Sequence, residues 1–243
     1  MKNYKEGVLF PDFDSLITKP RDDKAKEKWF DQKCRNFGLE LCTNAIKSGK
    51  YGIPLLPAYT GTLPNKLITF SEINNLSDTD AGVTGTDYDF ELDKIWYNPD
   101  KYISSLTNYK CFAEPDFSLC VGSPLSVQIA NTFRSHVIAY YAVEHSVKVL
   151  PNMSWSDTRS YDFCFDGHSK GGAVMVSTIG TLRDERSQMF FQSGFMEMLR
   201  RISPDSVLLY GDVNENILSW MPSQLHIQHV EHNRFKRARK HGR

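Results

Sequence analysis

The sequence lacks the features that mark membrane-bound and secreted proteins. Its longest apolar stretch, Val137–Val143, is far shorter than the roughly 20 residues that a membrane-spanning helix needs. Near the N-terminus, only the short apolar run Val8–Phe10 stands where a signal peptide would need a longer core. We therefore expect a soluble cytoplasmic protein with no membrane partner.

Signs of a disulfide framework or a redox motif are also missing. The cysteines are odd in number and include no Cys-x-x-Cys pair; they are Cys34, Cys42, Cys111, Cys120 and Cys164. Cys111 and Cys164 lie inside apolar runs. We interpret all five as reduced, mostly buried thiols of a reducing compartment.

The chain has no formal net charge, but its charges are unevenly spread. Residues 234–243 contain six basic side chains and no acidic one, so the remainder carries a matching negative excess. Such a run can bind the phosphates of nucleic acids without sequence preference, and it is equally typical of a solvated chain end. The candidate nucleic-acid-binding residues are Arg234, Lys236, Arg237, Arg239 and Lys240.

Short apolar bursts that stop on polar residues or glycine recur between residues 110 and 211. They cover residues 110–117, 147–155, 161–167, 173–180 and 207–211. Buried parallel strands are near-continuous apolar runs, because helices cover both of their faces. Helical patterns separate some of the bursts. This alternation predicts an α/β protein, with an irregular (β/α) barrel as our first choice and an open parallel sheet as the alternative.

We expect this barrel-like domain to span residues 51–230, between a partly helical N-terminal extension (1–50) and a basic tail (231–243). In the extension, apolar residues three to four apart predict helix over Asp22–Lys47. Two short helices broken at Asn98-Pro99 are predicted over Asp87–Leu106. A longer helix starts at Pro124, with Ser123 as its expected cap.

Carboxylates at the ends of the bursts are the best candidates for chemistry. Glu114 and Asp116 flank Pro115 at the end of one burst, and Asp166 ends another. Ligands collect at the carboxyl ends of parallel strands, where two acids can bind a metal or share acid–base work. The alternative is that Asp116 and Asp166 only cap turns.

Two other patterns fit their contexts poorly. The run Gly167-His-Ser-Lys-Gly171 formally matches a nucleophile elbow. The residues after it are β-branched and predict a strand where the elbow needs a helix, so a serine hydrolase using Ser169 is disfavoured. His226, His229 and His232 recur at a spacing of three. On a strand the first two face opposite sides, so we expect no metal site there.

Several short motifs follow one another in order over about Leu67–Gly211. They are Asn98-Pro-Asp-Lys-Tyr, Glu114-Pro-Asp-Phe-Ser-Leu, Pro124-Leu with Asn131 and Arg134, Val149-Leu-Pro-Asn-Met-Ser-Trp-Ser, Phe163-Cys-Phe-Asp-Gly, Val176-Ser-Thr-Ile-Gly and Leu209-Tyr-Gly. This series resembles the bacterial and phage family known as domain of unknown function 4417. The resemblance implies a phage or mobile-element origin, for which the expected compartment is the host cytoplasm, and it supplies no mechanism.

The family pattern also marks particular positions in this chain. The matching residues are Asp116, Ser118, Asn131, Arg134, Trp155, Asp166, Ser177 and Gly180. Glu114 stands where the pattern has a small residue, which weakens any scheme that needs it. The pattern features no serine nucleophile around Ser169.

Together these observations predict an enzyme that acts on nucleic acid or nucleotides at the strand-end face. Asp116 and Asp166 are its expected catalytic acids, and no metal or cofactor is specified. The expected substrate-binding residues are Asn131, Arg134, Trp155 and Ser177. For Arg134 the alternative is a structural ion pair, and for Trp155 a place in the core. The competing hypothesis is a non-enzymatic accessory protein that binds nucleic acid or another protein.

Overall fold

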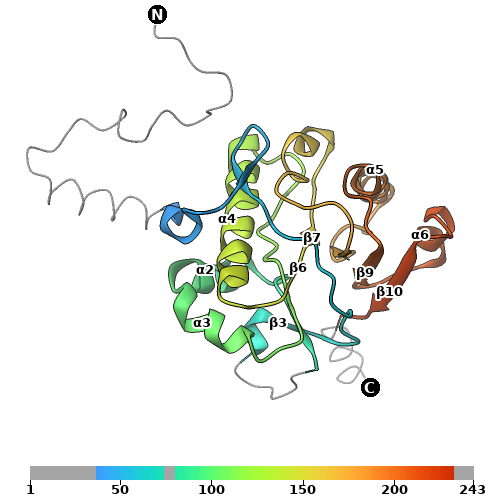
Figure 1. Cartoon of the computed structure of the whole chain (residues 1–243). Helices are drawn as coiled ribbons and strands as arrows, with labels where there is room; N and C mark the ends of the chain where they lie inside the picture. Colours follow the sequence, from blue (N-terminus) through green and yellow to red (C-terminus); the bar gives the residue numbers. More distant parts are fainter. Residues whose placement is uncertain (1–36, 74–79, 233–243) are drawn as a thin grey trace, which may run out of the picture.

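The computed structural model describes residues 37–73 and 80–232 (Figure 1). Most of the predicted N-terminal helical pattern and the basic residues of the tail lie outside these ranges. The described part is a mixed α/β structure in which all strands of the two larger sheets run parallel. The predicted fold class is therefore confirmed.

Two four-stranded sheets form the centre of the molecule. The first sheet has the order β3-β4-β5-β6, comprising Leu67–Thr69, Gly82–Thr84, Phe112–Ala113 and Val149–Leu150. The second has the order β10-β9-β8-β7, comprising His226–Val230, Ser206–Tyr210, Ala173–Ser177 and Asn152–Met153. Only Pro151 separates β6 from β7, so one extended segment borders both sheets. Proline lacks the N–H that a continuous ladder needs.

An apolar cluster between the sheets joins them into one curved arrangement. It contains Tyr59, Leu67, Cys111, Ala113, Leu150, Ala173, Met175, Leu208, Tyr210 and Val230. These side chains come from both sheets, which therefore share an interior, as in a barrel. Within the described ranges, no strand pairing connects β3 to β10. The Gln228 side chain instead donates to the carbonyl oxygen of Pro64 at 2.7 Å, just before β3.

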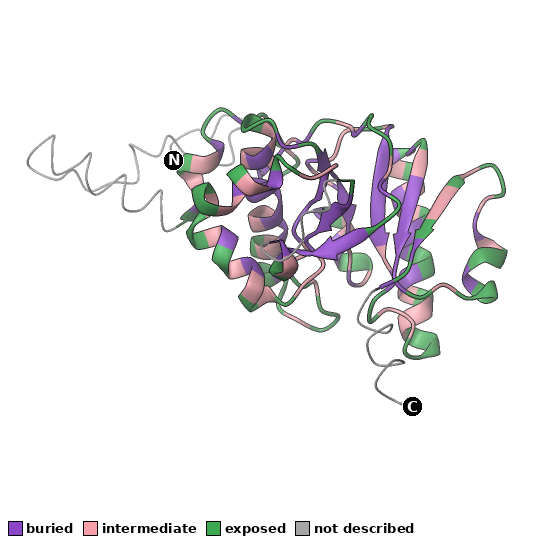
Figure 2. Ribbon diagram, turned by 90° about the horizontal axis from the view of Figure 1, so that it is seen from below, coloured by how far each residue is buried: buried purple, intermediate pink, exposed green. Residues whose placement is uncertain are grey.

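Helices cover the outside of each sheet (Figure 1). Helices α2 (Asp89–Tyr97), α3 (Pro99–Leu106) and α4 (Leu125–Glu144) contribute to the apolar core of the first sheet. Helices α5 (Glu185–Ile202) and α6 (Glu215–Trp220) contribute to that of the second. Buried residues concentrate in the strands and on the inward sides of the helices (Figure 2). None of the helices in the described ranges combines the length and apolar character that crossing a bilayer requires.

Short elements complete the described structure. Two antiparallel strands, β1 (Lys47–Ser48) and β2 (Ile53–Pro54), pair beside α4. The 3-10 helices are η2 (Leu39–Cys42), η3 (Phe70–Glu72) and η4 (Thr158–Asp162).

Several predicted helices are confirmed. Helices α2 and α3 meet at Asn98, and Pro99 occupies the first turn of α3, as its fixed φ and missing N–H favour. Helix α4 follows Pro124 as expected. Ser123 is not its cap, because the residue before the helix is Pro124 and no side-chain cap bond forms there.

Two predicted elements are wrong. Over residues 37–47, the described part of the helix expected to run to Lys47, the structure instead has η2 and the first residue of strand β1. The apolar burst at residues 161–167 is not a strand: η4 ends at Asp162, and the next three residues turn with their side chains buried in the second core. Periodicity cannot separate a short buried strand from a buried turn, because both are apolar. Asp166 therefore does not end a strand.

Candidate metal centre at the strand ends

The carboxylate of Glu114 lies at the carboxyl end of β5 and is 2% exposed. Its backbone N–H continues the ladder by donating to Leu150 at 3.0 Å. One carboxylate oxygen, Oε2, accepts a hydrogen bond from the backbone N–H of Asn152 at 3.2 Å. The first sheet and the β6–β7 segment thus hold this buried acid in place.

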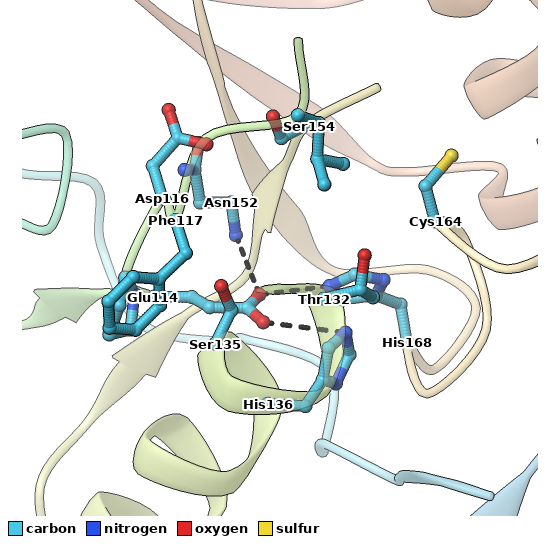
Figure 3. Close-up of a pocket in the computed structure, with 12 residues that line it drawn as sticks. Glu114, Asp116, Phe117, Thr132, Ser135, His136, Asn152, Ser154, Cys164 and His168 are labelled. Atoms are coloured by element: carbon cyan, nitrogen blue, oxygen red, sulfur yellow. Dashed lines mark hydrogen bonds and ion pairs between the residues drawn. The ribbon is translucent and has the colours of Figure 1, made fainter. Parts of the chain in front are cut away.

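Two imidazoles face this carboxylate (Figure 3). Nε2 of His168 lies 2.9 Å from Oε2 of Glu114, and Nε2 of His136 lies 3.4 Å from Oε1. Both imidazoles are almost completely buried. His136 lies in the middle of α4, and His168 lies in the segment before β8. We call Glu114, His136 and His168 the triad; their donor atoms lie within 4.8 Å of one another.

His136 is held between two hydrogen-bond acceptors. Its Nδ1 lies 3.0 Å from the carbonyl oxygen of Pro54, to which it donates. Its Nε2 faces Glu114, and this nitrogen has no hydrogen-bond partner. A neutral imidazole has one N–H and cannot donate in both directions. Burial lowers the pKa of His136 to about 4, although the Glu114 charge opposes that shift.

Glu114 itself is held in its charged form. Burial on its own would raise the pKa of this carboxyl group. The two imidazoles and the Asn152 N–H outweigh that effect, so the pKa lies below its ordinary value. A buried negative charge therefore faces two imidazole nitrogens.

A small inner cavity of about 20 Å³ adjoins the triad. Four residues that line it carry buried polar atoms without partners: Thr132 Oγ1, His136 Nε2, His168 Nδ1, and both Oδ1 and Nδ2 of Asn152. Native proteins leave few buried polar groups unpaired. Their concentration at one cavity marks it as a binding site for an ion or a polar group.

A larger outer cavity of about 470 Å³ adjoins the inner one. The two share the lining residues Asp116, Leu119 and Ser154. The remaining lining comes largely from segments that follow β4, β5, β7 and β8, so the outer cavity lies at the carboxyl ends of the strands. Its volume is in the range that small ligands occupy. Burial raises the pKa of Asp116 to about 6; the side chains of Ser154 and Asn152 oppose this shift, and the charges of Asp89 and Glu114 add to it.

Three of the predicted site residues line these cavities. Asp116 contributes to both, and Trp155 and Ser177 contribute to the outer one. The Trp155 ring also packs with Phe191 and Phe165, so it belongs to the core of the second sheet as well.

The other predicted site residues lie elsewhere. Asp166 lines neither cavity. Arg134 forms an ion pair with Asp93 and stacks on Phe117 at 3.8 Å. Asn131 donates to the carbonyl oxygen of Ser118 at 2.9 Å and so supports the loop after β5.

Ser169 and the C-terminal histidines have structural contacts instead. The Ser169 hydroxyl donates to the carbonyl oxygen of Leu56 at 2.6 Å, and strand β8 follows it, as its sequence predicted. His226 and His229 lie on strand β10. His229 Nε2 lies 2.7 Å from the carbonyl oxygen of Gly211.

Sequence reasoning missed the triad. His136 occurs within an apolar helical face, where a histidine is typical of the core, and Glu114 departs from the family pattern. The three residues are far apart in the sequence, so no ligand spacing brings them together. The available signal was the Glu114 carboxylate near the end of the apolar burst at residues 110–117.

Comparison with known proteins assigns the chain to a family. A family model described as Domain of unknown function (DUF4417) matches residues 45–227. The chain belongs to this family. The match includes the whole triad and confirms the resemblance that the motifs suggested.

Two phage proteins are similar to part of the chain. The "Gene 1 protein" of Mycobacterium phage L5 is 29% identical over 125 residues, covering 51% of this chain and 55% of the phage protein. The "Gene 1 protein" of Mycobacterium phage D29 is 30% identical over 123 residues, covering 51% and 46%. The chain thus matches about half the length of these relatives. No solved structure matches it.

Proposed function

We propose that the protein is a metal-dependent hydrolase whose divalent cation is held by Glu114, His136 and His168. The observation that carries this proposal is the position of His136 between Pro54 and Glu114. If Nδ1 donates to Pro54, the Nε2 lone pair faces a carboxylate oxygen of Glu114, and the two repel each other. A cation between them would replace this repulsion with two favourable contacts.

The ligand set suits catalysis better than a purely structural role. Two histidines and one carboxylate are the protein ligands of many catalytic zinc sites, which keep a further position open for water or substrate. The same set binds non-haem iron(II). Structural zinc sites are instead closed by four protein ligands.

The surroundings of the triad support this reading. Ligating histidines usually donate their other N–H to a carbonyl or carboxylate, which fixes the ring. The Pro54 carbonyl provides that contact for His136. The backbone N–H of Asn152 orients Glu114 in the same way.

The outer cavity is the proposed substrate site, and a phosphoester of a nucleotide or nucleic acid is the proposed substrate. The basic run at residues 234–243, the phage relatives and the Arg183 side chain in the cavity lining support this class. In the reaction, water adds to phosphorus and a phosphorus–oxygen ester bond breaks. Asp116, which lines both cavities, takes a proton from the water and returns one to the leaving oxygen.

Metal analysis tests the cation site directly. The full chain, loaded with zinc(II) and freed of excess metal, should retain about one ion per chain. His168→Gln and Glu114→Gln should each lose most of it. His145→Gln changes an exposed histidine at the end of the same helix and is the matched control. Circular dichroism confirms that each variant is folded. Equal zinc content in all four proteins would contradict the proposal.

Model esters test the reaction. The metal-loaded protein should hydrolyse bis(p-nitrophenyl) phosphate faster than its metal-free form does. Asp116→Asn should lower the rate by about a hundredfold or more while the metal content stays the same. Hydrolysis of p-nitrophenyl acetate alone would point to a carboxylic ester instead.

The basic tail supports a second candidate, a nucleic-acid contact through Arg234, Lys236, Arg237, Arg239 and Lys240. These residues lie outside the described ranges, so sequence alone carries this proposal. Affinity for DNA or RNA should fall with rising salt. Deletion of residues 234–243 should remove that affinity and leave the metal content unchanged. Unchanged affinity after the deletion would exclude the tail as the contact.

A further inference from the structure

Asn152 is the least explained buried residue beside the triad. It is 5% exposed, and its side-chain amide forms no hydrogen bond of good geometry; the group that the amide interacts with is the Asp116 carboxylate, whose pKa it lowers. It lines the inner cavity together with Glu114, His136 and His168. A buried amide with incomplete hydrogen bonds is costly, so this side chain indicates a ligand that completes its hydrogen bonds.

The backbone holds Asn152 firmly in this position. Its N–H donates to Oε2 of Glu114, and the residue pairs with Met175 in the register of β7 and β8. Pro151, immediately before it, accepts a hydrogen bond from the Met175 N–H at 2.8 Å. Asn152 is therefore tied to the second sheet and to the proposed metal ligand at once.

Thr132 presents a second unpaired group to the same cavity. It lies one helical turn before His136 on α4 and is 6% exposed, and its hydroxyl has no partner. Residues four apart share one face of a helix. The inner cavity thus has an amide and a hydroxyl, both able to bond a ligand, in a space for about one water-sized group.

We propose that Asn152 and Thr132 bind the oxygen atom that occupies the open position of the cation. With a cation bound, that oxygen would belong to water in the resting protein and to a phosphoryl group of the substrate. Donors aimed at an oxygen that gains negative charge stabilise the transition state. This inference rests on the proposed function, because it assumes a cation held by the triad. It assigns Asn152 a role in holding the exogenous group and none in holding the cation.

Anion binding to a cobalt-loaded protein separates these roles. The full chain is loaded with cobalt(II), and azide and inorganic phosphate are titrated while the visible absorption of the cobalt is followed. Asn152→Ala should keep cobalt affinity within about threefold of the unaltered chain. Its affinity for azide and phosphate should fall about ten- to a hundredfold, the range expected for a lost hydrogen bond to a charged group.

Two further variants keep the test decisive. Thr132→Val keeps the side-chain shape, removes only the hydroxyl, and should weaken anion binding in the same direction. Asn108→Ala alters an exposed asparagine after α3 and should leave both affinities unchanged. If Asn152→Ala fails to fold by circular dichroism, Thr132→Val carries the test.

The outcomes also separate this inference from the proposed function. No cobalt uptake by the unaltered chain would overturn both. Cobalt uptake with unchanged anion affinity in the folded variants would overturn this inference alone. A large loss of cobalt affinity in Asn152→Ala would also overturn it, because Asn152 would then be a metal ligand.

Discussion

Trp155 lies against Gly194, and its indole nitrogen is close to the position that a Cβ atom of residue 194 would occupy. A Cβ atom on Gly194 would stand 2.1 Å from Nε1 of Trp155. That nitrogen also donates to the carbonyl oxygen of Phe190 at 3.1 Å, one turn earlier on α5. Helix α5 thus fixes a ring that lines the outer cavity.

Gly194→Ala should therefore destabilise the protein. In an open helical position this change would stabilise by up to about 1 kcal/mol. Here the added methyl group would displace the indole, and overpacking of this kind costs about 1–3 kcal/mol. Urea denaturation measures the difference, with Gln192→Ala, an exposed change on the same helix, as control. A variant at least as stable as the unaltered protein would refute this packing.

Zinc should raise the unfolding temperature if the triad binds it. A ligand that binds only the folded state stabilises it by about 2.7 kcal/mol at a hundredfold excess over its dissociation constant. The increase should disappear with a chelator and should be absent in His136→Gln. Thermal denaturation followed by circular dichroism measures it. An equal increase in His136→Gln would place the zinc elsewhere.

Met175→Ala tests whether the two sheets share one core. Met175 is fully buried in the cluster between them, and its sulfur lies 4.0 Å from Oγ1 of Thr84 in the first sheet. Truncation should cost about 2–5 kcal/mol and lower a single unfolding transition. Met189→Ala, on the exposed side of α5, should cost far less. Separate transitions for the two halves would contradict a shared interior.

Glu197 should make stability depend on pH in the acid range. Hydrogen bonds from Arg200 and then Arg201 lower the pKa of its carboxyl group from 4.5 to about 2. A pKa depressed by folding stabilises the protein above the unfolded value, and this contribution is lost as the pH falls from about 4.5 towards 2. Because Arg200 is largely exposed, we expect a contribution of about 1 kcal/mol.

Glu197→Gln should thus be less stable than the unaltered protein at pH 7 and equally stable near pH 2. Urea denaturation across this range measures the gap, and the exposed Glu40→Gln serves as control. A gap that persists at low pH would show that packing, and not charge, is responsible.

The thiols should differ sharply in reactivity. The cysteines of the described ranges are free; Cys120 is exposed, and Cys42, Cys111 and Cys164 are buried. Burial raises the pKa of Cys111 to about 12, and thiolates are the reactive form. In a Cys34→Ser background, a maleimide should label the native protein at Cys120 alone. Labelling of Cys111 before denaturation would contradict its burial.

The sequence predicted the place of the candidate site, at the carboxyl ends of the strands, better than it predicted which residues form it. Asp116 was found because an apolar strand stops just before it, and that signal is local. His136 was not predicted because its role as a proposed ligand depends on Glu114 and His168, and only the folded chain brings these residues close to it. Asp166 was predicted as a catalytic acid at the end of a strand over residues 161–167. That segment is a buried turn, and buried turns and buried strands share the same apolar composition. Periodicity reports burial, and it carries no information on contacts between distant segments.

The proline between β6 and β7 also has a consequence for how the chain is made. The strands of the first sheet, together with Glu114 and His136, are complete in the nascent chain once residue 150 has left the ribosome. His168 and the partner strands of β7 follow later. A growing chain would therefore hold two of the three proposed ligands before it could capture a cation. Binding of the metal would then indicate that synthesis has passed Pro151, the boundary between the two sheets.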